Sequence, residues 1–278
     1  MIGQNKLRRE ILELIKTGRF PRFSIVVGER GSEKHEVPSY VADVSYMISI
    51  IETSVIVLSD NKVGTVRDYI DMAYKQTSTI IVVLPDADSM SAQAVNALLK
   101  VTEEPPNHAY FMMLADNESN LLETIKSRAY IFRMDRYTSK DLKDYMFEKY
   151  NISHTTLIDV CATPGDVDIV LKNGLDKFEE FYDFTYECIS DIIKCSGAKA
   201  FTLLDDVRNE VYDINMFFRF VQYHCLLSAK NSKDIDDRAN WCFTSTEAGF
   251  ALQDLSIKGI NKKMLLDTFV LNVRRIWR

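Results

Sequence analysis

The sequence lacks a CxxC pair, an excess of basic residues and a long apolar run, and each absence excludes a class of protein. The five cysteines are odd in number and widely spaced, which is poor for a metal site and favours free, mostly buried thiols in a reducing compartment. The formal net charge is −6, so overall basicity does not drive nucleic-acid binding. The charged N-terminal stretch is unlike a signal peptide, and no run approaches the roughly 18 apolar residues of a membrane span. We therefore expect a cytoplasmic protein without a membrane partner.

The first half of the sequence alternates between short β-branched runs and helical patterns. The runs are nearly continuous in apolar residues, as in strands that are covered on both faces. Such alternation predicts an α/β fold with a parallel sheet and right-handed crossovers. The predicted strands are Phe23–Val27, Val55–Leu58, Thr79–Leu84, Ala109–Leu114 and Ala129–Met134, and the predicted helices are Lys34–Ile48, Val63–Lys75, Ser91–Glu103 and Asn120–Lys126.

After Met134 the pattern is helical throughout. Thr138 is predicted to cap a helix that ends at Asn151, and a short helix over about residues 154–162 precedes the break TPGD at 163–166. From Gly174 onward, apolar residues recur at spacings of three and four, which predicts helices that each bury one stripe. We expect an α/β domain over residues 1–135, a small helical unit over 136–173 and an all-α domain over 174–278.

The stretch GERGSEKH, residues 28–35, is similar to a phosphate-binding loop. Gly28, Gly31 and Lys34 stand where a strand–GxxGxGK[ST]–helix pattern places its glycines and lysine. Glu33 replaces the second loop glycine and brings a carboxylate to a place where phosphate should lie. His35 replaces the hydroxyl residue and offers no oxygen ligand for Mg²⁺. On the loop alone, a simple glycine-containing turn is favoured over a nucleotide site.

The second half of a nucleotide-hydrolysing site is also altered. A strand that ends in Asp-Glu normally holds Mg²⁺ and polarises the attacking water. The strand TIIVVL instead continues with Pro85 and Asp86. Proline has no side-chain ligand, and we expect Asp86 and Asp88 to cap the turn into the next helix.

The stretch from Leu84 to Phe132 contains the segments DADSM, NALLKVTEEPP and TIKSRAYIF. It resembles the clamp-loader branch of the AAA+ ATPases, and in particular the delta-prime-type subunits of bacterial DNA polymerase III. The resemblance covers about residues 3–170 and implies an AAA+ sheet with helices on both faces, a helical lid and an all-α C-terminal collar domain for oligomerisation. The collar region itself matches only in being helical.

The resemblance assigns roles to several side chains. Arg128, with Ser127 before it, occupies the place of the family's arginine finger, which reaches the ATP of a neighbouring subunit in trans; Ala129 replaces the usual cysteine. An exposed arginine that caps a strand is the simpler alternative. Asn117 corresponds to a phosphate sensor or is a turn-forming asparagine, and both readings stay open. Asp166 replaces the basic second sensor, and the interval 46–54 is too short for the zinc module of many relatives.

The resemblance therefore implies a degenerate P-loop (Gly28, Gly31, Lys34) in a subunit that does not hydrolyse ATP, without bound ATP, Mg²⁺ or zinc. It would be an accessory subunit of the clamp-loader ATPase in DNA replication. Its expected partners are gamma/tau-type and delta-type loader subunits, the sliding clamp and primer-template DNA. Two alternatives remain: a loader subunit that itself binds or hydrolyses ATP, and an adaptor that borrows the fold to bind a protein partner.

Overall fold

The computed structural model describes residues 1–49, 51–195, 198–257 and 259–278, in two compact units. Unit 1 comprises Met1–Asn151 together with Thr163–Gly165, and unit 2 comprises Ile152–Ala162 together with Asp166–Arg278. The segment 136–173, predicted as a separate helical unit, is shared between them. Its first helix belongs to unit 1, and most of the remainder belongs to unit 2.

Unit 1 is built on a five-stranded parallel sheet with the strand order β2-β3-β4-β1-β5. Strand β1 pairs with both β4 and β5, so that Val27 lies opposite Ala115 on one side and Arg133 on the other. The predicted parallel α/β sheet is confirmed, and every predicted strand is present to within two residues. The strands are β1 (Phe23–Val27), β2 (Thr53–Val57), β3 (Thr79–Leu84), β4 (Ala109–Ala115) and β5 (Tyr130–Arg133).

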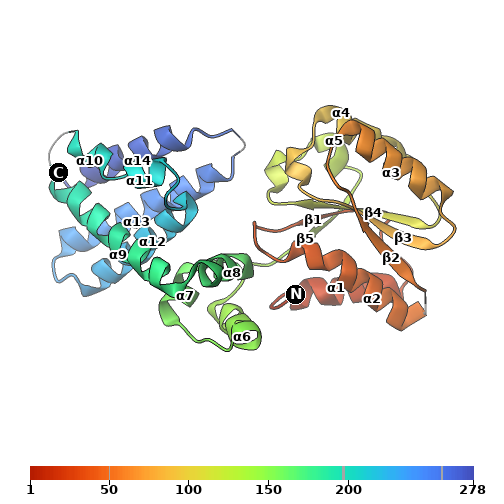
Figure 1. Cartoon of the computed structure of the whole chain (residues 1–278), viewed down its shortest axis with the longest axis horizontal. Helices are drawn as coiled ribbons and strands as arrows, with labels where there is room; N and C mark the ends of the chain where they lie inside the picture. Colours follow the sequence, from red (N-terminus) through yellow and green to blue (C-terminus); the bar gives the residue numbers. More distant parts are fainter. Residues whose placement is uncertain (50, 196–197, 258) are drawn as a thin grey trace. The chain divides into compact units, whose positions relative to one another are not determined.

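Helices cover both faces of this sheet, as Figure 1 shows. On one face lie α1 (Asn5–Lys16) and α2 (Val37–Ser49), whose buried residues include Leu7, Ile11 and Val41. On the other face lie α3 (Val63–Lys75), α4 (Ala92–Glu103) and α5 (Glu123–Lys126). Because both faces are packed, the strands need the nearly continuous apolar sequence from which they were predicted.

Helix α4 differs from the prediction in the face that it buries. The spacing of apolar residues predicts that Ala92, Val95, Leu98, Leu99 and Thr102 line one buried face. Val95 and Leu98 are buried, but Ala92 is exposed and Leu99 and Thr102 are only partly buried. The buried side chains are Ala94, Val95, Leu98 and Val101. The segment AQAVNALLKVTE carries apolar residues around most of its circumference, so the helical period fixes the existence of a stripe but not its phase.

The ends of two helices in unit 1 follow from local hydrogen bonding. Ser91 is the N-cap of α4, and its side chain accepts a hydrogen bond from the backbone N–H of Ala94. Thr138 forms a full capping box with Asp141 at the start of α6 (Ser139–Tyr150), which confirms the predicted cap. Asn151 ends α6 in the left-handed conformation, with a φ of 54°.

Unit 2 is entirely helical among its described residues. Its core contains tilted and edge-on aromatic rings from α9 and α12, where Phe220 contacts both Phe178 and Phe181. Spacing predicts one buried stripe in the region of α9 (Phe178, Phe181, Tyr182, Thr185, Ile189 and Ile192) and another in that of α14 (Leu265, Leu266, Phe269, Val270, Val273 and Trp277). These residues are buried except for Tyr182, Leu265 and Trp277, which are partly buried. The helices are α7 (Thr155–Val160), α8 (Pro164–Asn173, whose first two residues lie in unit 1), α9 (Leu175–Lys194), α10 (Lys199–Thr202), α11 (Asp205–Arg208), α12 (Ile214–Asn231), α13 (Ile235–Leu255) and α14 (Lys262–Ile276).

Two further observations concern the described residues only. None of their helices combines the length and the apolar character that crossing a membrane requires. All five cysteines are free thiols, and three of them are buried, as expected.

Candidate functional site

The candidate site lies at the carboxyl ends of the central strands of unit 1, where open parallel sheets usually bind ligands. The loop of residues 28–35 follows β1 directly, and the backbone N–H of Gly28 donates to the carbonyl of Ala115 at the end of β4. The turn that contains Asp88 follows β3, and Asp88 contacts the backbone after β4. The sheet thus brings the loop, the altered Asp-Glu position and Asn117 to one edge.

Gly31 adopts a conformation that requires glycine, with a φ of +83°. Its carbonyl accepts a hydrogen bond of 2.9 Å from the backbone N–H of Gly165. A Cβ on Gly31 would lie 2.6 Å from the hydroxyl of Thr163 and 3.1 Å from Cα of Gly165. The segment 163–165 therefore packs directly on the loop.

Glu33 combines a left-handed backbone with a mostly buried carboxylate. Its φ of 57° is left-handed, the region in which glycine is strain-free. The side chain is mostly buried, with 12% exposed, and its carboxylate lies 3.4 Å from the backbone N of Ile2 and 3.8 Å from the Met1 ammonium. Burial, followed by the nearby Glu36, raises the pKa of Glu33. The loop therefore holds a glycine-like backbone conformation at position 33 together with a partly desolvated acid.

Lys34 is the residue that would neutralise a bound phosphate, and it already has an anionic partner. Its ammonium forms an ion pair with the carboxylate of Asp116, directly after β4, and lies 3.5 Å from the carbonyl of Glu29. Only 13% of the lysine side chain is exposed. The residues after it form a 3₁₀ turn, Lys34–Glu36, before α2 begins, so the predicted helix Lys34–Ile48 starts three residues later as an α-helix. An incoming phosphate would have to displace Asp116.

The two aspartates after β3 have different roles. Asp86 occupies the predicted cap position of the turn, but its side chain makes no capping hydrogen bond. Its backbone carbonyl instead accepts from the N–H and hydroxyl of Ser89. The prediction for Asp88 is wrong, because its carboxylate accepts from the backbone N–H groups of Asp116, at 2.6 Å, and Asn117, at 3.0 Å. Asp88 therefore anchors the end of β4, while Ser91 caps the following helix.

Asn117 makes the hydrogen bond of a turn residue. Its side-chain oxygen accepts from the backbone N–H of Ser119 at 2.9 Å, at the start of a 3₁₀ turn over Glu118–Asn120. The predicted helix Asn120–Lys126 is accordingly shorter, because α5 begins only at Glu123.

Arg128 lies in the short turn between α5 and β5. Its Nη1 donates to the carbonyl of Thr124 at 3.0 Å, and its Nη2 lies 3.7 Å from a carboxylate oxygen of Glu103 at the end of α4. The side chain remains 42% exposed. The hydroxyl of Ser127 also donates to Thr124, at 3.2 Å. The guanidinium is held in one direction and stays accessible, which a ligand on another chain would require.

Asp166 lies in unit 2, at the start of α8, and has a partner that sequence analysis did not find. Its carboxylate accepts from the backbone N–H of Ala162 at 3.1 Å and forms an ion pair with Arg219 of α12. Both side chains are 19% exposed. The two residues are 53 positions apart in the sequence, and no local pattern links them.

No metal cluster of three or more His, Cys, Asp or Glu side chains occurs among the described residues. The interval 46–54, which was expected to be too short for a zinc module, contains Ile50, which lies outside the described residues. Its other residues end α2 and begin β2.

Comparison with known proteins agrees with the resemblance. Residues 42–138 match the family model described as DNA polymerase III, delta subunit. A DNA polymerase III delta′ subunit of Buchnera aphidicola is 29% identical over 42% of this chain and 35% of its own length. A delta′ subunit of Yersinia pestis is 39% identical over 24% of this chain and 21% of its own length. The resemblance to DNA polymerase III delta′ subunits is confirmed.

The same comparisons also include gamma/tau subunits. That of Mycoplasma genitalium is 22% identical over 78% of this chain and 45% of its own length. A gamma subunit-related protein of Thermotoga maritima has a solved structure with 18% identity and a TM-score of 0.44, covering 98% of this chain and all of that one. The alignments span about a third or less of the first delta′ relatives. The family match contains Asn117 and Arg128 but begins after the loop 28–35, whose interpretation therefore depends on its geometry.

Proposed function

We propose that this chain is a delta′-type subunit of the DNA polymerase III clamp loader that does not hydrolyse ATP and supplies an arginine finger to a neighbouring ATPase subunit. In DNA replication it would help to load the sliding clamp on primed DNA. Its partners would be gamma/tau-type and delta-type subunits, the clamp and, within the complex, primer-template DNA. The all-α C-terminal domain would provide the oligomerisation surface.

The ion pair between Lys34 and Asp116 carries the first half of this proposal. A triphosphate entering the loop would meet the carboxylates of Asp116 and Glu33, and like charges at such short range repel strongly in a partly desolvated site. At positions 35 and 85, His35 and Pro85 provide no oxygen ligand of the kind that Mg²⁺ prefers. Each of these features opposes Mg·ATP independently.

Isothermal titration of the purified chain with Mg·ATP tests whether the loop of residues 28–35 binds nucleotide. A gamma-type subunit is the positive control. We expect no heat of binding at micromolar protein concentration. Micromolar binding would favour the alternative in which this subunit itself uses ATP. That alternative draws support from the retained Lys34 and from the left-handed backbone of Glu33, which preserves the shape of the loop.

Arg128 carries the second half of the proposal. A guanidinium keeps its charge and can present two parallel N–H groups to phosphate oxygens. The hydrogen bond from Nη1 to the carbonyl of Thr124 orients the guanidinium, and the exposed part of the side chain is accessible to another subunit. An arginine finger supplied in trans accelerates phosphoryl transfer by about 10³–10⁵.

Reconstitution of the loader with an Arg128→Ala chain tests the finger. We expect the complex to assemble normally while DNA-stimulated ATP turnover at the served site falls by about 10³. Arg128→Lys should recover only part of the turnover, because an ammonium lacks the planar fork. Arg67→Ala, which removes another exposed arginine from α3, is the matched control. Wild-type turnover in the Arg128→Ala complex would contradict the finger, and failure of the chain to associate with any loader subunit or clamp would favour the adaptor alternative.

A further inference from the structure

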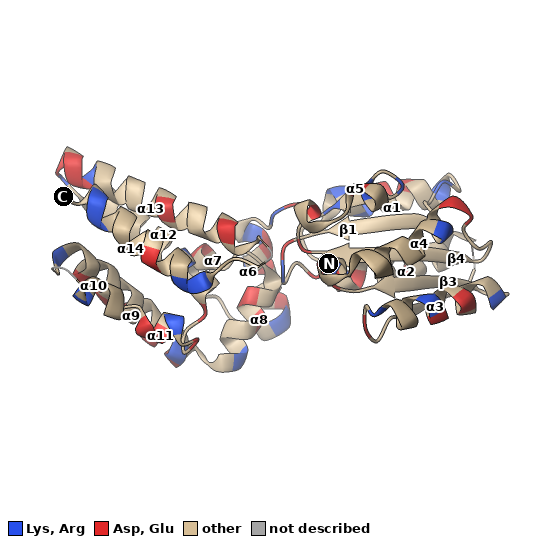
Figure 2. Ribbon diagram, turned by 90° about the horizontal axis from the view of Figure 1, so that it is seen from above, with Lys and Arg blue, Asp and Glu red and all other residues tan. Residues whose placement is uncertain are grey.

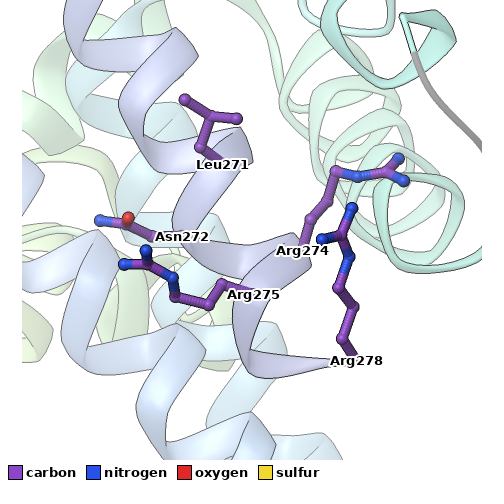
Figure 3. Close-up of a pocket in the computed structure, with 5 residues that line it drawn as sticks. All are labelled: Leu271, Asn272, Arg274, Arg275 and Arg278. Carbon is purple, nitrogen blue, oxygen red and sulfur yellow. The ribbon is translucent and has the colours of Figure 1, made fainter.

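The last turns of α14 carry three arginines within five residues, Arg274, Arg275 and Arg278. Together with Leu271 and Asn272 they line a hollow of about 330 Å³ on unit 2. Figure 3 shows the guanidinium group of Arg278 directed toward the side chain of Arg274, whose own guanidinium points away from α14. The guanidinium of Arg275 lies on the other side of the helix, beside the amide of Asn272. The hollow is thus bordered by positive charge and by hydrogen-bond donors.

These three guanidinium groups lack carboxylate partners in the part of the chain that the structure describes. Elsewhere in unit 2, Arg208 and Arg219 each form an ion pair with an aspartate. Figure 2 shows basic ribbon beside the C-terminus, next to a segment of acidic ribbon, in a protein whose net charge is −6. Like charges on one helix end repel one another, and an anion bound in the hollow would offset that repulsion.

The turn that carries the arginines is anchored on several sides. The indole N–H of Trp277 donates to the hydroxyl of Thr244 at 3.0 Å, and its ring packs edge-on against Trp241 of α13 with centroids 4.6 Å apart. The amide of Asn272 donates to Glu247 at 2.7 Å. The hollow is therefore bordered by a fixed helix end rather than by a loose chain end.

Arg274 is itself fixed, because its Nη1 donates to the carbonyl of Cys195, after α9, at 2.7 Å. The remaining donors of a guanidinium lie in the same plane as the bonded one, so this contact sets the direction in which Arg274 can bind an anion. Arginines at the end of a helix are also favoured by the macrodipole. That effect explains their location on α14 but not the hollow that they border.

We propose that this hollow binds phosphate groups, either of a nucleic-acid backbone or of a free polyphosphate such as pyrophosphate. Arginine matches phosphate geometry with paired N–H groups, and the volume is at the lower end of the roughly 300–1,000 Å³ of ligand pockets. Neither the loop after β1 nor Arg128 takes part. The inference concerns unit 2 alone and stands whether or not the chain is a loader subunit.

Binding of two probes to the full chain tests the inference. A fluorescein-labelled thymidine oligonucleotide is titrated by anisotropy at several salt concentrations, and pyrophosphate is titrated by calorimetry. We expect Arg275→Gln/Arg278→Gln to weaken oligonucleotide binding at least about tenfold and to reduce the salt slope by about 1.4, since each single-strand phosphate contact contributes about 0.7. Arg274 is left in place because its bond to Cys195 is structural.

The matched control is Lys6→Gln/Arg9→Gln, which removes the same charge from exposed positions of α1 in unit 1. This variant should bind both probes as the wild type does. A second variant, Arg275→Lys/Arg278→Lys, keeps the charge and should lose most pyrophosphate binding while retaining most of the salt slope, because lysine cannot fork. If Arg275→Gln/Arg278→Gln does not fold, the lysine variant is used in its place.

Each outcome decides the proposal. If the glutamine variant, but not the α1 control, loses binding of both probes, the hollow is a site for backbone phosphates. If the wild type binds pyrophosphate but no oligonucleotide, and the glutamine variant loses that binding, the ligand is a free polyphosphate. No binding of either probe to the wild-type chain, or equal losses in the glutamine variant and the α1 control, would overturn it.

Discussion

The ammonium of Lys34 is paired with the carboxylate of Asp116, and the backbone N–H of Asp116 is in turn held by Asp88 at 2.6 Å. In a phosphate loop this lysine binds the ligand. Here Lys34 binds Asp116, whose position at the end of β4 is fixed by its backbone hydrogen bond to Asp88. The positive charge of Lys34 is therefore already neutralised by an acid of the same chain, before any anionic ligand binds.

Freeing Lys34 alone should not create a nucleotide site, because Glu33 stays in the loop. We expect Asp116→Asn to leave Mg·ATP binding undetectable by calorimetry. Combining it with Glu33→Gly and His35→Thr removes both acids and supplies a hydroxyl ligand, so the triple variant should show measurable binding. Asp86→Asn, an exposed acid at the same edge, is the control. Binding by Asp116→Asn alone, or none by the triple variant, would contradict the electrostatic account.

Gly31→Ala should destabilise unit 1 more than an ordinary left-handed glycine would. Its new Cβ would meet the Thr163 hydroxyl at 2.6 Å and the backbone of Gly165, so the segment 163–165 would have to move. Gly18→Ala is a matched control, because Gly18 also has a positive φ but has nothing within 4 Å. We expect the control to cost about 1 kcal/mol in unfolding free energy and Gly31→Ala about 2–3 kcal/mol. Equal losses of unfolding free energy for Gly31→Ala and Gly18→Ala in urea titrations would show that the close approach of residues 163–165 does not affect stability.

The ion pair of Asp166 with Arg219 should show strong coupling. Removing the arginine leaves a mostly buried carboxylate uncompensated, so we expect Arg219→Gln to lower the unfolding free energy by about 2–3 kcal/mol. Asp166→Asn/Arg219→Gln removes both charges and should recover a large part of that loss. A double-mutant cycle with a coupling energy near zero would mean that the pair is screened by solvent.

His224 should make the stability of unit 2 depend on pH. Burial lowers its pKa from the ordinary 6.5, opposed by the hydrogen bond with the carbonyl of Tyr182 and by the charge of Asp183. The tyrosine rings of Tyr186 and Tyr223 also face it. Between the folded and unfolded pKa values the unfolded chain binds more protons, so stability is complete above about pH 6.5 and is lost as the pH falls.

We therefore expect urea unfolding midpoints to decrease between about pH 7 and pH 5, and His224→Gln to flatten that slope. His35→Gln, which replaces an exposed histidine, is the control and should keep the wild-type slope. An unchanged slope in His224→Gln would assign the dependence to other groups.

The thiols should differ in reactivity. Burial raises the pKa of both Cys188 and Cys225 to about 12, while Cys242 is exposed. Iodoacetamide followed by mass spectrometry of peptides should therefore label Cys242 first and leave the two buried thiols unmodified until urea unfolds the chain. Early labelling of Cys225 would indicate local opening of α12.

Sequence patterns predicted the parts of the fold that depend on local preferences. The strands followed from continuous apolar runs, and Thr138 was recognised as a cap because the bond it makes lies within its own helix. The buried face of α4 was placed incorrectly, because apolar residues surround most of that helix and tertiary packing selects among them.

The candidate site was only partly predictable. The replaced residues Glu33, His35 and Pro85 are visible in the sequence, because a motif fixes the positions at which they differ. The partners of Lys34, Asp88 and Asp166 are not visible, since each lies on an element brought close only by the fold. Charge pairing across the sheet edge has no sequence period, and residue types alone do not reveal it.

At Gly31 and Gly165, two backbone segments of the chain are in contact. Each segment occupies the volume that a side chain on the other would need. A clash with a side chain can be relieved by trimming that side chain, but backbone atoms cannot be substituted away. Among homologous sequences, these two positions should therefore vary together or not at all, and an insertion beside either one would be the expected route by which both escape the constraint.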